Sequence, residues 1–330
     1  MIILEVCNRA VEEILNTRFE QVKAESRYEK IDYKVADFDG VLYSITNPTN
    51  DKKKILVSIF IKFFTELKEH GVMEVLAREY GDLLLSSPEP NQSVTLCIDL
   101  ENLPEDCTRL AYKCGLLKRN CMAAVFERFF EYQANSSNVQ SGSKRAIIHF
   151  REDETMYVQA LPDRVTVIFS TIFKDPDDML IGKVFMQEFT EARRRLDRAP
   201  QVLYSHRVPP AELQGTDAVV NDSVAYITFV LFPRHLANDT VRNSTIDLIQ
   251  TLRTYLHYHI KCSKAYIQMR MRAKTLEFLK VLNRAHIEYP TSPVIKTNVN
   301  DELLSTAVLV ASSSPTSSVT NKFTGGITTK

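Results

Sequence analysis

The chain has 330 residues, of which 41 are basic and 41 acidic, so its formal net charge at pH 7 is zero. This length predicts about two domains of ordinary size, each able to bury its own core. The balanced charge excludes a strong overall attraction to nucleic acid or membranes, so such a preference would need local clusters of charge. No stretch has membrane-spanning length and the first residues lack a signal-peptide pattern, so we expect a cytoplasmic protein.

Six cysteines occur, with no Cys-x-x-Cys pair. This usage is typical of a reducing compartment and argues against a disulfide framework or a zinc knuckle. Cys107, Cys114 and Cys121 are spaced by seven and would share one stripe of a continuous helix, but we expect a break between the first two. Burial in the core is favoured over metal binding.

The first part of the chain predicts a helix, then a meander of strands, then more helices. The expected elements are a helix over 3–20, strands over 33–38, 41–45 and 54–59, helices over 60–80, and a strand over 94–99. Asp39-Gly40 should form a tight hairpin turn with two positive φ angles. A polar loop containing Pro104 follows the last strand.

The next part repeats this order in outline. We expect a helix over 116–132 and strands over 146–151, 155–160, 164–173, 180–190, 200–206 and 224–232. Helices before and after runs of antiparallel strands favour an α+β fold over a doubly wound parallel sheet. The prediction is two tandem related domains, 1–115 and 116–237, each an antiparallel sheet with flanking helices.

Residues 238–285 predict one long α-helix, because no Gly or Pro interrupts them and apolar residues recur every three or four positions. At about 1.5 Å per residue, some 40 residues extend roughly 60 Å, which exceeds the width of such a domain. The far end should therefore lie on another chain or in water, and its apolar residues favour a partner. Residues 286–330 are rich in Ser and Thr and predict a disordered tail.

One segment imitates an enzyme motif. Ala36-Asp37-Phe38-Asp39-Gly40 resembles the magnesium-dependent haloacid-dehalogenase phosphatases, in which Asp37 would be the nucleophile and Asp39 the acid and base. That fold needs a buried, continuously apolar parallel strand before the first Asp, whereas residues 31–36 alternate. The hairpin interpretation is therefore favoured, with the phosphatase as the alternative.

Other signals of chemistry are weak. Glycine-rich nucleotide motifs are absent, and His257 and His259 should face different directions on a helix, which excludes an obvious zinc pair. We therefore predict no catalytic residue, no cofactor and no metal site.

Basic residues gather on the long helix. Arg253, His257, Lys261, Lys264 and Arg272 fall on one face, and Arg270 and Lys274 extend the positive charge. This face could simply be solvated, but the length and apolar residues of the helix favour an acidic partner surface. Nucleic acid is less favoured as a partner, because no known nucleic-acid-binding motif accompanies the basic cluster. Membrane insertion is not expected, since the apolar side should contact protein.

Several segments resemble one known family, the large scaffold subunits of the actin-related protein 2/3 complex, which nucleates branched actin filaments. They include Ala36-Asp-Phe-Asp-Gly-Val-Leu-Tyr, Ile181-Gly-Lys-Val-Phe-Met-Gln-Glu-Phe and Tyr255-Leu-His-Tyr-His-Ile-Lys-Cys-Ser-Lys-Ala-Tyr-Ile. The resemblance covers residue 1 to about 285 and departs from the family pattern after Arg284 and over 86–115.

The resemblance implies a non-catalytic protein with two related α+β domains and a long C-terminal helix. It also implies that the chain pairs with the fourth subunit, holds actin-related protein subunits 2 and 3, and contacts the mother filament. The expected location is the cytoplasmic actin cytoskeleton, at the leading edge and in cell projections. The matching positions expected to contact actin or the partner subunit are Arg253, Lys261, Lys264, Arg270, Arg272 and Lys274.

Overall fold

The computed structural model describes residues 4–25, 27–49, 51–135, 145–196, 199–216 and 218–285. The chain divides into two units, Met1–Arg270 and Met271–Lys330. The first unit contains both β-sheets, and the described part of the second contains the last residues of a helix. None of the helices within the described residues is long and apolar enough to cross a bilayer.

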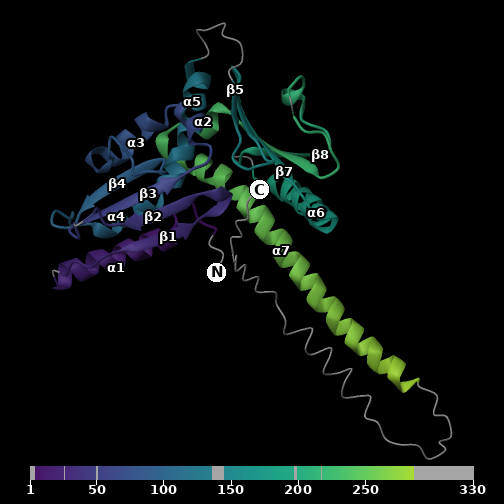
Figure 1. Cartoon of the computed structure of the whole chain (residues 1–330). Helices are drawn as coiled ribbons and strands as arrows, with labels where there is room; N and C mark the ends of the chain where they lie inside the picture. The colour runs from purple at the N-terminus through teal and green to yellow at the C-terminus, as the bar shows by residue number, and fades with distance from the viewer. Residues whose placement is uncertain are drawn as a thin grey trace, which may run out of the picture. The chain divides into compact units, whose positions relative to one another are not determined.

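The first sheet is a four-stranded antiparallel meander (Figure 1). Its strands, in spatial order, are β1 (Asp32–Ala36), β2 (Leu42–Thr46), β3 (Lys54–Phe60) and β4 (Val94–Asp99). The helices of this part are α1 (Arg9–Glu25), α2 (Phe64–Lys68), α3 (Val72–Tyr80), α4 (Cys107–Gly115) and α5 (Leu117–Asn135). The predicted meander is confirmed, and so are helices in the regions expected at 3–20, 60–80 and 116–132.

The turn between β1 and β2 has the predicted geometry. Asp39 and Gly40 have φ angles of 67° and 69°, and the Asp37 backbone N–H donates to the Val41 carbonyl over 2.8 Å. Aspartate tolerates the left-handed region better than most residues and glycine enters it without steric cost. The turn therefore places Asp39 at one end of the first sheet, between β1 and β2.

The second sheet has five antiparallel strands. Their spatial order is β5 (Arg145–Ile148), β6 (Met156–Ala160), β7 (Val165–Ile172), β9 (Val224–Leu231) and β8 (Gln201–His206). Together with the first sheet and the long C-terminal helix, this confirms the predicted α+β class. The domain boundaries at 115 and 237 stay a prediction.

The expected strand over 180–190 is wrong, because these residues belong to helix α6 (Pro176–Arg193). Asp175 caps this helix by accepting a hydrogen bond from the Asp177 backbone N–H, and Pro176 occupies the first turn. Both features are typical helix starts. Ile181, Phe185 and Phe189 then recur every four residues, which is the helical and not the strand period.

The expected loop before residue 116 contains helix α4, which is capped by the side chain of Asp106. Cys107 and Cys114 both lie on α4, so the predicted break between them is wrong. The break comes after Gly115, where α4 ends, and Cys121 lies on the next helix, α5. All three thiols are buried, as predicted. Within the described ranges, no group of His, Cys, Asp and Glu side chains could hold a metal ion.

Helix α7 (Asp239–Arg284) has 46 residues and is the predicted long helix. The Asn238 side chain caps it by accepting from the Val241 backbone N–H over 2.9 Å. Its first half contributes Ile246, Ile249, Leu252, Leu256 and Ile260 to a core that also includes residues of both sheets. Residues beyond Ile260 are exposed up to Ala285, apart from the half-buried Lys264. The predicted tail, 286–330, lies outside the described residues.

Candidate protein interface

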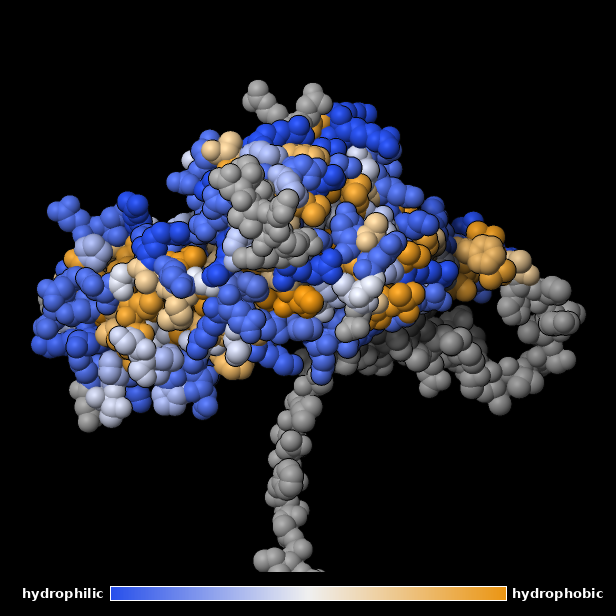
Figure 2. Space-filling model, turned by 90° about the horizontal axis from the view of Figure 1, so that it is seen from above, coloured by the Kyte–Doolittle hydropathy of each residue, from blue (hydrophilic) through white to orange (hydrophobic). Residues whose placement is uncertain are grey.

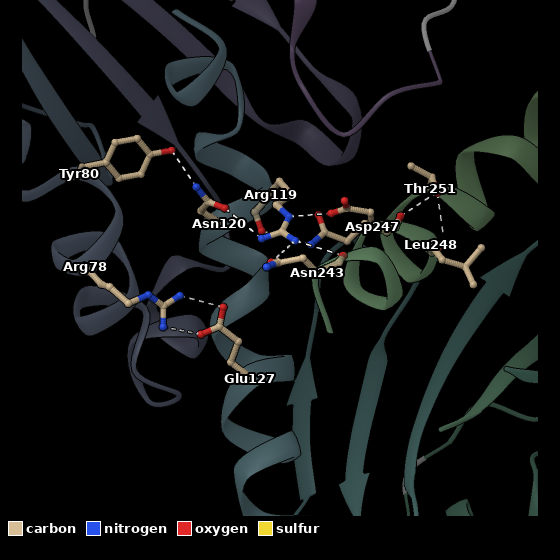
Figure 3. Close-up of polar contacts among 10 residues, drawn as sticks. Arg78, Tyr80, Arg119, Asn120, Glu127, Asn243, Asp247, Leu248 and Thr251 are labelled. Atoms are coloured by element: carbon tan, nitrogen blue, oxygen red, sulfur yellow. Dashed lines mark hydrogen bonds and ion pairs between the residues drawn. The ribbon is translucent and has the colours of Figure 1, made fainter. Parts of the chain in front are cut away.

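Arg119 of α5 fixes the start of α7 (Figure 3). Its guanidinium donates to the Asp247 carboxylate over 2.7 Å and to the Asn243 side chain over 2.8 Å, and a third hydrogen bond reaches Asn120. Asn120 in turn donates to the Tyr80 hydroxyl over 3.1 Å. Arg119 is buried, so these charge-assisted hydrogen bonds replace its hydration. The first turns of α7 therefore have a fixed attachment within the first unit.

Arg253 lies in a second buried network, which we call the central ion-pair network: Asp39, Lys118, Arg151, Glu154 and Arg253. Arg253 pairs with Glu154, and both side chains are less than a tenth exposed. Asp39 lies 2.6 Å from Arg151, 3.3 Å from Lys118 and 3.7 Å from Arg253. The network joins the first hairpin, α5, the second sheet and α7.

The charges in this network stabilise one another. Burial opposes ionisation of Asp39, yet Lys118, Arg151 and Arg253 hold the pKa of its carboxyl below the ordinary value. Burial lowers the pKa of Arg253, and Glu154 counteracts that shift. The charge of Arg253 is therefore paired with acidic side chains of the same chain.

The same geometry argues against the phosphatase alternative. Asp37 directly precedes the turn of an antiparallel hairpin and Asp39 lies within that turn, whereas that chemistry needs both at the end of a buried parallel strand. Three cationic side chains surround Asp39, and a carboxylate neutralised in this way is a poor ligand for magnesium. Asp39 instead forms ion pairs that join separate elements of the fold.

Lys264 is also engaged within the chain. Its ammonium pairs with Asp175 and, over 3.1 Å, with Asp178, at the first turn of α6. The hydrogen bond from Lys264 to Asp175, followed by that to Asp178, raises the pKa of the lysine. Of the six basic residues expected to make contacts, Lys264 and Arg253 therefore have acidic partners far away in the sequence.

The other four basic residues are exposed. Lys261 and Arg270 belong to the first unit, and Arg272 and Lys274 belong to the second. Lys274 pairs with Glu277 over 2.7 Å, but both side chains are about two thirds exposed. Such an exposed pair contributes little free energy, so it leaves Lys274 available to a partner.

Large apolar side chains are exposed on both parts of α7. In the first unit these are Leu248, Tyr255, Tyr266, Ile267 and Met269. In the second unit, six side chains are each 53–63% exposed: Met271, Leu276, Phe278, Leu279, Val281 and Leu282. Hydrophobic residues also interrupt the hydrophilic surface seen in Figure 2. A dense set of exposed apolar residues beside basic ones is typical of a protein-binding surface.

The two histidines of α7 have different surroundings, as predicted. His257 lies against Phe173, and burial together with Arg253, Arg151 and Lys261 lowers the pKa of its ring to about 4. His259 stacks on Phe185 and Tyr255.

Comparisons with known proteins agree with this architecture. Residues 57–289 match the family model described as "Arp2/3 complex, 34 kD subunit p34-Arc". A Schizosaccharomyces pombe protein named actin-related protein 2/3 complex subunit 2 is 40% identical over 305 residues, covering 86% of this chain and 94% of the relative. A Dictyostelium discoideum protein of the same name is 36% identical over 299 residues, covering 90% of this chain and 97% of the relative. The chain therefore belongs to the family of the 34 kD subunit of the Arp2/3 complex.

Proposed function

We propose that the chain is a non-catalytic scaffold subunit of an actin-related protein 2/3 complex. In this role it pairs with the fourth subunit, holds actin-related protein subunits 2 and 3, and contacts the mother filament during branched actin nucleation. The observation that carries the proposal is the exposed basic and apolar surface of α7, in a chain similar over most of its length to two proteins named for this subunit.

The exposed apolar residues of α7 support pairing with another subunit. Burying a leucine or phenylalanine side chain contributes about 1.5–3 kcal/mol, so Leu276, Phe278 and Leu279 together could stabilise a complex substantially. Exposed apolar residues this dense mark a surface that another protein covers in the cell. We propose the fourth subunit as that cover.

The exposed cations support contact with an acidic surface. We assign this contact to Lys261, Arg270, Arg272 and Lys274, and we propose the mother filament as the acidic partner. Arg253 and Lys264 are left out of the contact, because their charges are paired within the chain. Long-range attraction from exposed cations would accelerate encounter with the filament and would weaken with salt.

We also propose that residues 1–115 and 116–237 are related domains, that 238–285 is the partner-binding helix, and that 286–330 is a tail. The proposed location is the cytoplasmic actin cytoskeleton, including the leading edge and cell projections. We assign no cofactor to the chain, and neither nucleic acid nor membrane insertion is part of the proposal.

The test is cosedimentation of the assembled complex with actin filaments. The double variant Arg270→Glu/Arg272→Glu should bind filaments about tenfold more weakly or worse, since two attractive charges become repulsive. Lys30→Glu/Lys34→Glu makes the same change in charge at exposed positions outside α7 and should bind as the wild type does. Equal filament binding by both variants would contradict the proposal that α7 contacts the filament.

A separate variant tests pairing with the fourth subunit. Leu276→Asp/Leu279→Asp places two carboxylates among the exposed apolar residues of the second unit. Purification through a tag on this chain should then recover less of the fourth subunit, because the charges would have to be desolvated in the interface. Undiminished recovery would contradict the proposed pairing surface.

A further inference from the structure

Thr275 lies on the exposed part of α7, within a sequence pattern typical of a phosphorylation site. Arginine precedes it by five residues, at Arg270, and by three residues, at Arg272. Basophilic serine/threonine kinases recognise this Arg-x-Arg-x-x-Ser/Thr spacing, because acidic side chains in their substrate groove bind both guanidinium groups. No other Ser or Thr in the sequence has arginine at both positions. The pattern therefore singles out Thr275.

The part of α7 that carries Thr275 can unwind locally, as a kinase requires, since kinases bind their substrates as extended chains. Every residue over 271–285 is exposed, so no buried side chain within this range holds the helix in place. Helices depend on tertiary packing for most of their stability, and unpacked helix ends open at low cost in free energy. The Thr275 hydroxyl donates to the Met271 carbonyl over 2.9 Å, and unwinding releases this hydrogen bond. Thr275 is therefore accessible before a partner covers the helix.

Thr275 also lies among the apolar residues of the second unit. Four apolar side chains stand four residues before it and three, four and seven residues after it, which are the spacings of one helix face: Met271, Phe278, Leu279 and Leu282. Each of the four is more than half exposed. A phosphorylated threonine carries nearly two negative charges at pH 7, and in an apolar interface it disrupts packing because these charges would have to be desolvated. Phosphorylation would therefore place charge in the middle of the surface assigned to the fourth subunit.

We propose that a basophilic serine/threonine kinase phosphorylates Thr275, and that this modification blocks pairing with the fourth subunit. The inference rests on the function proposed above. In the reaction, the threonine hydroxyl oxygen attacks the γ-phosphorus of magnesium-bound ATP. The bond from that phosphorus to the ADP oxygen breaks as the new O–P bond forms, and the hydroxyl proton passes to the catalytic aspartate of the kinase. Because pairing covers Thr275, the kinase acts on the unassembled chain.

The first step of the test treats the purified full-length chain with protein kinase B and magnesium-ATP, followed by peptide mass spectrometry. Thr275 should be phosphorylated and Thr17 should not. Thr17 is a matched control, because it is also an exposed helical threonine that donates to the carbonyl four residues earlier, over 2.8 Å, but it has no arginine three or five residues before it. Arg270→Lys/Arg272→Lys keeps both charges without the guanidinium groups and should reduce phosphorylation about tenfold. Absence of phosphate at Thr275 would overturn the site.

The second step mixes the treated and untreated chains with purified fourth subunit and measures its recovery through a tag on this chain. Phosphorylation should lower recovery about tenfold or more. In Thr275→Val, which lacks the hydroxyl, kinase treatment should not change recovery. Equal recovery by phosphorylated and untreated wild type would overturn the control of pairing and leave the scaffold function intact. An untreated wild-type chain that recovers no fourth subunit would overturn the proposed pairing, and this inference with it.

Discussion

Replacing Arg253 by methionine should destabilise the fold and leave the filament contact intact. Methionine keeps an apolar chain of similar length but removes the charge, so Glu154 remains buried with only the more distant Arg151, at 3.6 Å, and the Ile172 backbone N–H at 3.0 Å. Removing one partner of a buried ion pair costs about 3–5 kcal/mol. Because Glu154 keeps these two partners, we expect a loss of about 3 kcal/mol in the free energy of unfolding.

Urea denaturation followed by far-ultraviolet circular dichroism measures this loss. With a denaturant slope of about 3 kcal/mol per molar, the midpoint should fall by about 1 M. The matched control is Arg270→Met on the exposed part of α7, which should change the free energy of unfolding by less than about 0.5 kcal/mol. Cosedimentation with filaments should show the opposite pattern: Arg270→Met should weaken binding, and Arg253→Met should not. An unchanged midpoint for Arg253→Met, or folded Arg253→Met that no longer binds filaments, would refute the assignment of Arg253 to the interior.

Three further predictions concern the packing around α7. The pKa of His257 is about 4 in the folded chain against 6.5 for an unperturbed ring, so the unfolded chain binds more protons between these values. Stability should therefore fall by about 1.5 kcal/mol from pH 6.5 to pH 5, and urea midpoints of His257→Phe should lack this loss. Gly182→Ala would place a Cβ 3.1 Å from the Ile260 side chain. Overpacking of about 1–3 kcal/mol should exceed the gain of about 1 kcal/mol in helix propensity, so the melting temperature should fall, and a rise would contradict this packing. Arg119→Met removes the partly buried bond to Asp247 together with the other hydrogen bonds of this guanidinium, and should lower the urea midpoint by up to about 1 M; an unchanged midpoint would mean that these bonds do not stabilise α7.

Local sequence patterns were sufficient for much of the fold. The Asp39-Gly40 turn was predictable because its two residues tolerate positive φ, and α7 was predictable from its period and its lack of Gly and Pro. The dense apolar residues of helix α6 favour a strand, although Asp175 and Pro176 mark a helix start. In that segment the capping residues were more informative than hydrophobicity.

The candidate site was only partly predictable. Helical spacing shows which basic residues share a face of α7, but it does not show which of them meet acids elsewhere in the chain. Arg253 pairs with Glu154, 99 residues away, and Lys264 pairs with Asp175, 89 residues away. Such contacts depend on how α6 and the second sheet pack on α7, and no local pattern encodes that. Asp39 had a visible signal, but its pattern was that of a catalytic motif, whereas its role is structural.

The central claim is that this chain is a scaffold whose helix α7 holds partner subunits. The most direct test is a pull-down from cytosol with the full-length chain as bait, compared with a chain that ends at Arg270 and so keeps every buried residue of α7. Bound proteins are then identified by mass spectrometry. We expect the full-length chain to recover the fourth subunit and the actin-related subunits, and the shortened chain to recover much less of them. A full-length chain that recovers none of these proteins would contradict the account.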